Sequence, residues 1–392
     1  MLISRWRKGT LTIGERSGHI NKGWDDNWEL MQYKNKDRRL GLSGLMRVKD
    51  EAETLAQSID SCIDVLDELI ITYHDCTDGS VQIIENKKLQ YPDKILVVPY
   101  SYHVLGGYGA TDEEYEYAKT LPIGHPQLLA TYYNNALQYV NYKYVVKIDA
   151  DQIYFTQDFM ALKNSIVMGV NQSSFARLCG KMVSMFGQRR GNQWIWSKFS
   201  PFHWLQYIIV PLFKKQYVDY VVSKLLEGNG YLSLSGVNVL QYNGQWYTSL
   251  GLNLVGRTGW PYMGMGDHLI FEADEQTEYV PEDFELDSGK RVLIEGFRFP
   301  KEKKLFLLGF YWFHFKLMKA RSYNQFVSCF DGQTKGLFPV EQLRNVSFDY
   351  LLRYLNTGDS YWYLSKRNYF NFVHNLSRKE IRVENLRSLS YK

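Results

Sequence analysis

The chain has 392 residues, of which 45% are apolar and 22% are charged. This composition is typical of a folded globular protein and excludes a disordered one, and the length allows one large core or a domain with a smaller appendage. The net charge is +4, and Lys and Arg are scattered along the chain, which argues against a nucleic-acid-binding protein. Aromatic residues reach 16%, a share that suits both a large core and a surface that stacks on sugar rings.

The four cysteines do not indicate a metal site. Cys62, Cys76, Cys179 and Cys329 show neither a Cys-x-x-Cys pair nor the Cys/His spacing of a zinc site. Free thiols in a reducing compartment are the simplest interpretation.

Two further patterns bear on membranes. The first residues lack the apolar core of a secretory signal, and the longest apolar run, 207–213, is too short to span a bilayer. The mildly basic tail, 344–392, suits either a solvated helix face or contact with an anionic membrane or glycan. These patterns predict a cytoplasmic protein that is at most peripheral to the inner membrane.

Short apolar runs alternate with helical patterns in the first half of the chain. The expected strands are residues 41–48, 68–74, 94–100 and 143–149. The expected helices are residues 50–66, 80–88 and 125–140, the last with Pro126 in its first turn. Buried strands alternating with helices indicate an α/β fold, with a mainly parallel sheet covered on both faces. Such sheets bind ligands beyond the carboxyl ends of their strands.

The pattern changes after residue 171. Residues 230–243 and 245–259 are typical of shorter strands joined by glycine turns. Residues 203–226 predict a helix, and the tail predicts further helices at 348–355 and 368–376.

Two carboxylates follow the strand 143–149. Asp149 and Asp151 form the only strict Asp-x-Asp in the sequence. A solvated surface turn is the plainer interpretation of such a pair, but its place at the end of a buried strand favours a site for a hard divalent cation.

The loop 73–80 follows the second expected strand. Asp78 and Ser80 suit a tight turn that caps the next helix. Asp75 has no such task, and its carboxylate can accept a hydrogen bond from the N–H of a uracil ring.

These motifs resemble the family-two nucleotide-diphospho-sugar glycosyltransferases of the GT-A fold. The run from Arg47 to Glu51 keeps the Arg and the Glu of the family's Arg-Asn-Glu motif. The run 133–137 has Tyr133 where the family has an Arg. The match is good over 41–160 and partial to 316, and the sequence is similar to bacterial enzymes that build lipopolysaccharide or capsule.

The resemblance implies a Rossmann-like GT-A fold and a metal-dependent, inverting enzyme. It would move a sugar from a UDP-sugar to an oligosaccharide or glycolipid acceptor, with Mn²⁺ or Mg²⁺ bound. The implied divisions are an N-terminal arm (1–40), a GT-A domain (41–330) with a nucleotide-sugar half (41–155) and an acceptor half (156–330), and a helical extension (331–392).

The resemblance also assigns roles to residues. The expected contacts of the nucleotide sugar are Leu45, Met46, Arg47, Asp75, Asn134, Lys147, Asp149 and Ala150. The expected metal ligands are Asp149, Asp151 and the late His314. The expected general base is Asp267, which follows a glycine-containing loop and would open a helix; its reserves are Glu272, Asp274 and Glu295. Lys316 and Lys319 would face the diphosphate or solvent.

Simpler interpretations remain for several of these residues. His314 lies in an aromatic run, where a core hydrogen bond would satisfy the imidazole as well as a metal would. Asp267 also suits an N-cap. Trp246, Trp260 and Tyr262 are expected either to stack on acceptor sugars or to pack in the core.

Three alternatives concern the activity as a whole. A sugar-phosphate nucleotidyltransferase would need a glycine-rich loop after the first strand, and residues 47–53 lack one. A non-catalytic glycan-binding or scaffold protein on the same fold would share these motifs without the activity. An enzyme that retains the anomeric configuration of the sugar would not need Asp267 as a general base.

Overall fold

The computed structural model describes residues 37–387 apart from 108, 188–202, 250–252, 255–256, 259–260, 265, 275–276, 287–288, 299, 301, 320–322, 324–335 and 353–360. The expected arm at 1–40 lies almost wholly outside these residues, as do Trp260 and Cys329. Within them Cys62, Cys76 and Cys179 are free thiols. No helix of the described ranges combines the length and the apolar character needed to cross a membrane.

The first half of the chain alternates strands and helices as expected. The strands are β1 (Arg39–Val48), β2 (Glu68–Tyr73), β3 (Ile95–Pro99), β4 (Tyr142–Asp149) and β5 (Gln152–Tyr154). The helices are α1 (Leu55–Cys62), α2 (Ser80–Gln90), α3 (Asp112–Thr120), α4 (Leu129–Leu137) and α5 (Thr156–Met168).

The second half has helices first, then short strands, then helices again. The helical elements are α6 (Ser174–Gly187), η3 (His203–Leu205), α8 (Gln206–Leu212), α9 (Lys214–Leu226), η4 (Lys316–Met318), η5 (Val340–Gln342), α11 (Phe348–Leu352), α12 (Tyr361–Ser377), η6 (Arg378–Glu380) and α13 (Glu384–Arg387). The strands are β6 (Gly230–Asn238), β7 (Leu240–Tyr242), β8 (Gln245–Ser249), β9 (Asn253–Leu254), β10 (Arg257–Thr258), β11 (Tyr262–Met263), β12 (Leu269–Glu272), β13 (Tyr279–Glu285), β14 (Arg291–Phe297), β15 (Lys304–His314) and β16 (Leu337–Pro339).

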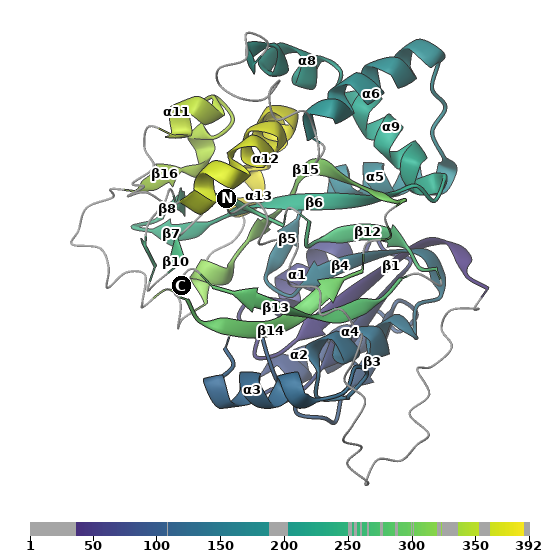
Figure 1. Ribbon diagram of the computed structural model, residues 1–392, viewed down its shortest axis with the longest axis vertical. Helices are drawn as coiled ribbons and strands as arrows, with labels where there is room; N and C mark the ends of the chain where they lie inside the picture. The colour runs from purple at the N-terminus through teal and green to yellow at the C-terminus, as the bar shows by residue number, and fades with distance from the viewer. Residues whose placement is uncertain are drawn as a thin grey trace.

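One large mixed sheet runs through the molecule (Figure 1). In the described part of the chain it has nine strands, in the order β3-β2-β1-β4-β12-β6-β15-β5, with β11 paired to β6. β1 lies in parallel between β2 and β4, and β15 is parallel to β6. β12 is antiparallel to both β4 and β6. The ends of β1, β2, β4 and β15 and the start of β12 therefore meet at one edge of the sheet.

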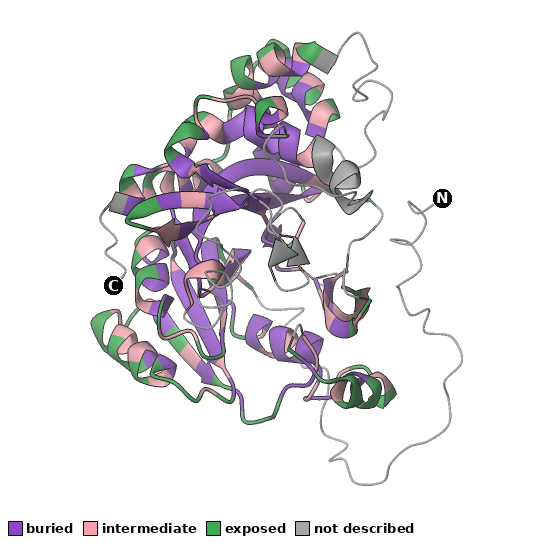
Figure 2. Cartoon of the chain, turned by 90° about the vertical axis from the view of Figure 1, so that its left-hand side faces the viewer, coloured by how far each residue is buried: buried purple, intermediate pink, exposed green. Residues whose placement is uncertain are grey.

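Side chains alternate between the two faces of this sheet, as the period of a strand requires. From β1, Leu42 and Met46 enter the larger hydrophobic cluster, and Leu45 enters a smaller one on the other face. Helices α1, α5, α9 and α12 contribute to the larger cluster, and α4 to the smaller. Figure 2 shows the buried residues on the strands and inner helix faces and the exposed ones on the outer faces. The predicted α/β sheet with helices on both faces is confirmed.

Some expected boundaries were wrong. The helix expected from 50 begins at Leu55, after a turn, and the one expected from 125 begins at Leu129. Pro126 lies before that helix rather than in its first turn, and its carbonyl oxygen accepts a hydrogen bond of 2.7 Å from the hydroxyl of Tyr100.

A helix was missed between the strand expected at 94–100 and the helix expected at 125–140. α3 begins with a capping box, in which the Thr111 side chain accepts from the Glu114 backbone and the Glu114 side chain accepts from the Thr111 backbone. The sequence Thr-Asp-Glu-Glu carries this signal.

The helix expected at 203–226 is divided in two. Pro211 lies inside α8, and at Phe213 the backbone leaves the helical conformation before α9 begins at Lys214. The Phe213 N–H still donates to the Ile209 carbonyl at 3.1 Å, so the break is confined to the backbone angles of Phe213 itself.

The C-terminal helix α12 packs into the main core. His374 in this helix is fully buried. Its Nε2–H donates to the carbonyl oxygen of Val346 at 2.9 Å, so its Nδ1, 2.6 Å from the hydroxyl of Tyr262, accepts. Burial lowers the pKa of His374 to about 3.

This neutral histidine should make stability depend on pH. Between pH 7 and pH 5 the unfolded chain binds a proton at His374 that the folded chain does not, so folding should lose about 2 kcal/mol through this residue. His374→Gln keeps a donor and an acceptor but does not titrate. Urea unfolding at the two pH values should show a smaller loss in the variant by about that amount. An equal loss in both proteins would contradict the assignment.

Candidate active site

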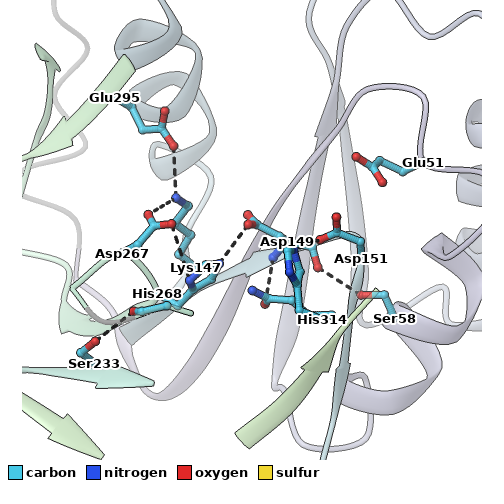
Figure 3. A network of polar contacts seen from close by, with 12 residues as sticks. Glu51, Ser58, Lys147, Asp149, Asp151, Ser233, Asp267, His268, Glu295 and His314 are labelled. Atoms are coloured by element: carbon cyan, nitrogen blue, oxygen red, sulfur yellow. Dashed lines mark hydrogen bonds and ion pairs between the residues drawn. The ribbon is translucent and has the colours of Figure 1, made fainter. Parts of the chain in front are cut away.

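The turn after β4 brings Asp151 beside His314, at the end of β15 (Figure 3). β5 continues from this turn and pairs with β15, where Gln152 lies opposite His314. The His314 Nε2 atom is 3.3 Å from one carboxylate oxygen of Asp151, and the Lys319 ammonium is 2.8 Å from the other. Burial alone would raise the pKa of Asp151, but His314 and Lys319 lower it, so the carboxylate is ionised at neutral pH.

The orientation of His314 fits a metal ligand. Its Nδ1 lies 2.7 Å from the side-chain oxygen of Asn238. If Nδ1 carries the proton that this contact requires, Nε2 presents its lone pair to the Asp151 carboxylate. Two electron-rich atoms facing each other need a cation between them or a second proton on the ring. A backing carbonyl oxygen that fixes the tautomer is the usual arrangement behind a metal-binding histidine.

Lys319 joins this group to the motif after β1. Its ammonium contacts both Glu51, at 2.6 Å, and Asp151. Burial is the main cause that raises the pKa of Glu51 to about 7, with Lys319 acting against it and Asp151 adding to it. The Glu of the Arg-to-Glu run thus lies beside the Asp-x-Asp turn.

Helix α1 holds the backbone of the Asp-x-Asp turn. The Thr54 hydroxyl donates to the Ala150 carbonyl at 3.0 Å, and the Ser58 hydroxyl donates to the Asp149 carbonyl at 3.3 Å (Figure 3). These bonds hold the backbone from which the two carboxylates project.

A second group lies where β4 ends and β12 begins. Asp149, Asp267 and His268 offer ligand atoms that all lie within 4.8 Å of one another, so this group too is able to hold a cation. The His268 Nε2 is 2.9 Å from Asp149, and its Nδ1 is 3.6 Å from Asp267. Burial lowers the pKa of His268, but the two carboxylates outweigh it and raise the pKa overall. A protonated imidazole bridging two carboxylates satisfies this geometry without a metal.

Lys147 lies beneath Asp267, with a side chain only 4% exposed. Its ammonium is 2.6 Å from Asp267 and 3.1 Å from Glu295. Burial lowers the pKa of Lys147, but Asp267, Tyr133 and Glu295 raise it well above its ordinary value. Lys147 is therefore an ammonium that faces carboxylates, and Glu295, a reserve base in the sequence analysis, is one of its partners.

Tyr133 stands where the family pattern has an arginine, and two cations contact its ring. The Arg47 guanidinium carbon is 5.4 Å and the Lys147 ammonium 5.3 Å from the ring centre. Positive charge therefore reaches this place from β1 and β4 instead of from α4. Such contacts contribute about 0.5–2 kcal/mol each.

The expected contacts of Leu45 and Met46 with the nucleotide stay predictions. Both side chains are buried, one in each hydrophobic cluster. Their backbones pair with β2 on one side and β4 on the other. The neighbouring Arg47 side chain lies near the carboxylates of Asp149 and Glu295.

The side chain of Asn134 is bonded to the backbone of β13. Its side-chain nitrogen donates to the Tyr279 carbonyl at 2.8 Å, and its side-chain oxygen accepts from the Tyr279 N–H at 2.9 Å. This pair ties α4 to β13, and Asn134 acts there as a structural residue.

Asp267 does not open a helix. It lies in a turn between Gly264 and β12, and its backbone N–H donates to the Gly264 carbonyl at 3.1 Å. Gly264 and Gly266 have φ angles of +91° and +90°, a conformation that favours glycine. The glycine loop was predicted, but the element after it is a strand, so an N-cap role is excluded.

Of the three aromatic residues expected near an acceptor, two lie in the core. Tyr262 is 1% exposed and stacks near Phe310, and Trp246 packs on Phe315. Neither offers a ring face to a sugar in this arrangement.

Asp75 follows β2 with a φ of +45°. One of its oxygens is 2.6 Å from His103 Nδ1 and 3.3 Å from His74 Nδ1. Burial raises the pKa of Asp75, but the hydrogen bonds from His103 and His74 lower it overall. The carboxylate is partly exposed and ionised.

A comparison with known proteins bears on the activity. The family model for beta-1,4-N-acetylgalactosaminyltransferase (CgtA) matches residues 15–172. That stretch contains β1 to β5, the Asp75 loop and the Asp-x-Asp turn. This chain is a nucleotide-sugar glycosyltransferase. The resemblance found in the sequence is confirmed, and the family match favours an enzyme over the scaffold and nucleotidyltransferase alternatives.

Solved structures resemble the glycosyltransferase only loosely. TarS of S. aureus (residues 1–349) has 11% identity and a TM-score of 0.31, over 90% of this chain and 76% of that one. Glucosyl-3-phosphoglycerate synthase from Mycobacterium tuberculosis, in complex with Mn²⁺ and UDP-glucose, has 19% identity and a TM-score of 0.21, over 33% of this chain and 40% of that one. Such low scores transfer neither a ligand nor a residue's role. No curated protein matches the glycosyltransferase.

Proposed function

We propose that the glycosyltransferase binds a divalent cation, Mn²⁺ or Mg²⁺, and transfers a sugar from a UDP-sugar to a carbohydrate acceptor with inversion. The observation that carries the proposal is the Asp151–His314 pair, backed by Asn238 and placed at the edge where the strands end. We further propose that residues 41–155 bind the donor, 156–330 the acceptor, and that 331–392 is a helical extension of the domain.

The cation would be held by Asp151 and His314, with Asp149 nearby. When bound, it would neutralise charge that builds on the departing nucleoside diphosphate. Lys319 would add a positive charge at the same place, since its ammonium already faces Asp151. Arg47 is partly buried near Asp149, Glu295 and Tyr133. Its guanidinium would lie behind the donor.

Asp267 would act as the general base. The acceptor hydroxyl oxygen forms a bond to the anomeric carbon, and the bond from that carbon to the diphosphate oxygen breaks. The electron pair leaves with the nucleoside diphosphate, and the hydroxyl proton passes to Asp267. Lys147 and His268 hold this carboxylate in place and keep it ionised.

Asp75 would recognise uracil through an N–H of the ring. This requires His103 to release the oxygen that it contacts, and His103 is half-exposed, so it has room to move. We further propose that the donor carries N-acetylgalactosamine, the sugar in the name of the matched family. We also propose a role in lipopolysaccharide or capsule synthesis with a glycolipid acceptor.

A thermal-shift screen would test the donor and the metal together. We expect one UDP-sugar to stabilise the chain selectively in the presence of Mn²⁺, by about 2.7 kcal/mol at a hundred times its Kd. UDP-N-acetylgalactosamine is the first to try, with the corresponding GDP- and CMP-sugars as controls. Equal stabilisation in the presence of a chelator would contradict a metal-dependent site.

A further inference from the structure

Helices α6 and α8 contact each other at one end of the molecule, beyond β15 (Figure 1). Both turn large apolar side chains to solvent; Phe175 is 70% and Leu212 65% exposed. Residues four apart lie on one side of a helix, so those of η3 and α8 form a single line. The α6–α8 face consists of Phe175, Leu178, Met185, Trp204, Ile208 and Leu212.

Helix α6 is apolar on both sides. Its inner side packs against α9, with Val183 buried, and Gly180 lies so close that an added Cβ would come within 2.4 Å of the Gln216 carbonyl oxygen. The inner side is therefore already used, and the apolar outer side has no partner in the described chain. A surface helix normally presents polar residues outward, as α2 does with Glu85 and Asn86. Contiguous exposed apolar faces mark interaction sites.

The described helices of this face carry basic and no acidic residues. No Asp or Glu occurs in α6, η3 or α8, whereas α6 contains Arg177 and Lys181. Both basic side chains are exposed, as are the apolar ones of the same helix. The described surface that exposes the apolar side chains is therefore also basic.

The ion pairs of α6 leave part of this charge free. Arg177 contacts Glu227 of the loop after α9 at 2.8 Å. Lys181 is exposed and has no acidic partner among the described residues. A surface that is both apolar and basic is complementary to an anionic bilayer, because apolar side chains enter the acyl boundary while Lys and Arg meet the headgroups. Trp204 suits the interface between the two.

We propose that the α6–α8 face binds the surface of an anionic phospholipid bilayer. The contact is peripheral, since no described helix has the length and apolarity to span a membrane. It differs from the basic tail suggested by the sequence, because α12 of that tail packs its apolar residues into the core. The proposal does not depend on which sugar the enzyme moves.

Vesicle flotation would test this face directly. The probes are vesicles of phosphatidylcholine alone and of phosphatidylcholine with phosphatidylglycerol. We expect the full chain to float with the anionic vesicles and to be released by added salt. The double substitution Leu178→Glu and Ile208→Glu should reduce the bound fraction at least about tenfold, because two inserted side chains become charged. Lys181→Ala should weaken binding to the anionic vesicles about fivefold.

The matched control is Leu89→Glu. Leu89 is 79% exposed but lies on α2, at the other end of the molecule (Figure 1). This substitution should leave flotation unchanged. Circular dichroism and transfer to a soluble acceptor check that each variant is folded. If the double variant fails to fold, Ile208→Ser and Lys181→Ala supply the same comparison singly.

Three results would overturn the proposal. The first is no flotation with anionic vesicles, and the second is an equal loss in Leu89→Glu. The third is a dimer of the unaltered chain in size-exclusion chromatography that becomes a monomer in the double variant. This would show that the face joins two copies of the chain. If the unaltered chain floats with anionic vesicles but transfers no sugar to a soluble acceptor, the result would count against the proposed function and not against this face.

Discussion

Asp151→Asn should reduce kcat about 100- to 1,000-fold, the usual effect of removing one group that stabilises charge in the transition state. The carboxylate is buried and faces both His314 and Lys319, so the amide of the variant would lack the negative charge that this position presents. Initial rates measured over a range of Mn²⁺ concentrations should show the loss. Mn²⁺ binding to the free protein, followed by electron paramagnetic resonance, should weaken in parallel.

The control for this substitution is Asp67→Asn. Asp67 is also a partly buried carboxylate with a lysine partner, Lys163 at 2.9 Å, but it accepts from the N–H of Leu42 near the start of β1. It therefore lies at the edge of the sheet away from the site. This variant should keep both its rate and its Mn²⁺ affinity. A normal rate in Asp151→Asn, or normal Mn²⁺ binding, would show that the cation is not held there.

The fold was predictable where local patterns repeat. The buried strands after Leu40 are continuous apolar runs, and the rule that ligands bind beyond strand ends placed Asp75, Asp149 and Asp151 at one edge. The errors were at element ends. Residues 50–54 are mostly polar and were joined to the apolar helical pattern that starts at Leu55, whereas the Thr54 hydroxyl is used in a tertiary bond to Ala150.

The partners of the site residues were not predictable. Asn238 and Lys319 approach Asp151 and His314 from separate strands and loops, and no spacing in the sequence links them. His103 is 28 residues from Asp75, and only the fold brings the two together. The bond of His268 was equally hidden in the sequence, because its partner Asp149 is 119 residues away at the end of β4.

One misassignment has a clear physical origin. Asp267 was expected to open a helix because it follows a glycine-containing loop, as in the family that the sequence resembles. The segment after it instead forms β12, which pairs with β4 and β6, and a single sequence does not specify these neighbours.

The state of the base determines the pH dependence of the reaction. Burial raises the pKa of Asp267, but Lys147 and His268 outweigh it and lower the pKa overall. Half of the Asp267 side chain contacts solvent, which tempers the shift. A base with a lowered pKa is active above that pKa and loses activity as pH falls through it. The loss of kcat/KM that protonation of Asp267 itself causes should therefore fall below the ordinary pKa range of an aspartate.

Asp267→Asn should lower kcat about 100- to 10,000-fold, because the acceptor proton then has no base. Asp274→Asn is the control, since Asp274 follows β12 a few residues later and pairs with Lys303. Lys147→Gln removes the main cause of the lowered pKa, so the acidic loss of activity should move to higher pH while Asp267 remains in place. A product with the anomeric configuration of the donor, seen by NMR, or full activity in Asp267→Asn, would exclude Asp267 as the base and with it inversion by this route.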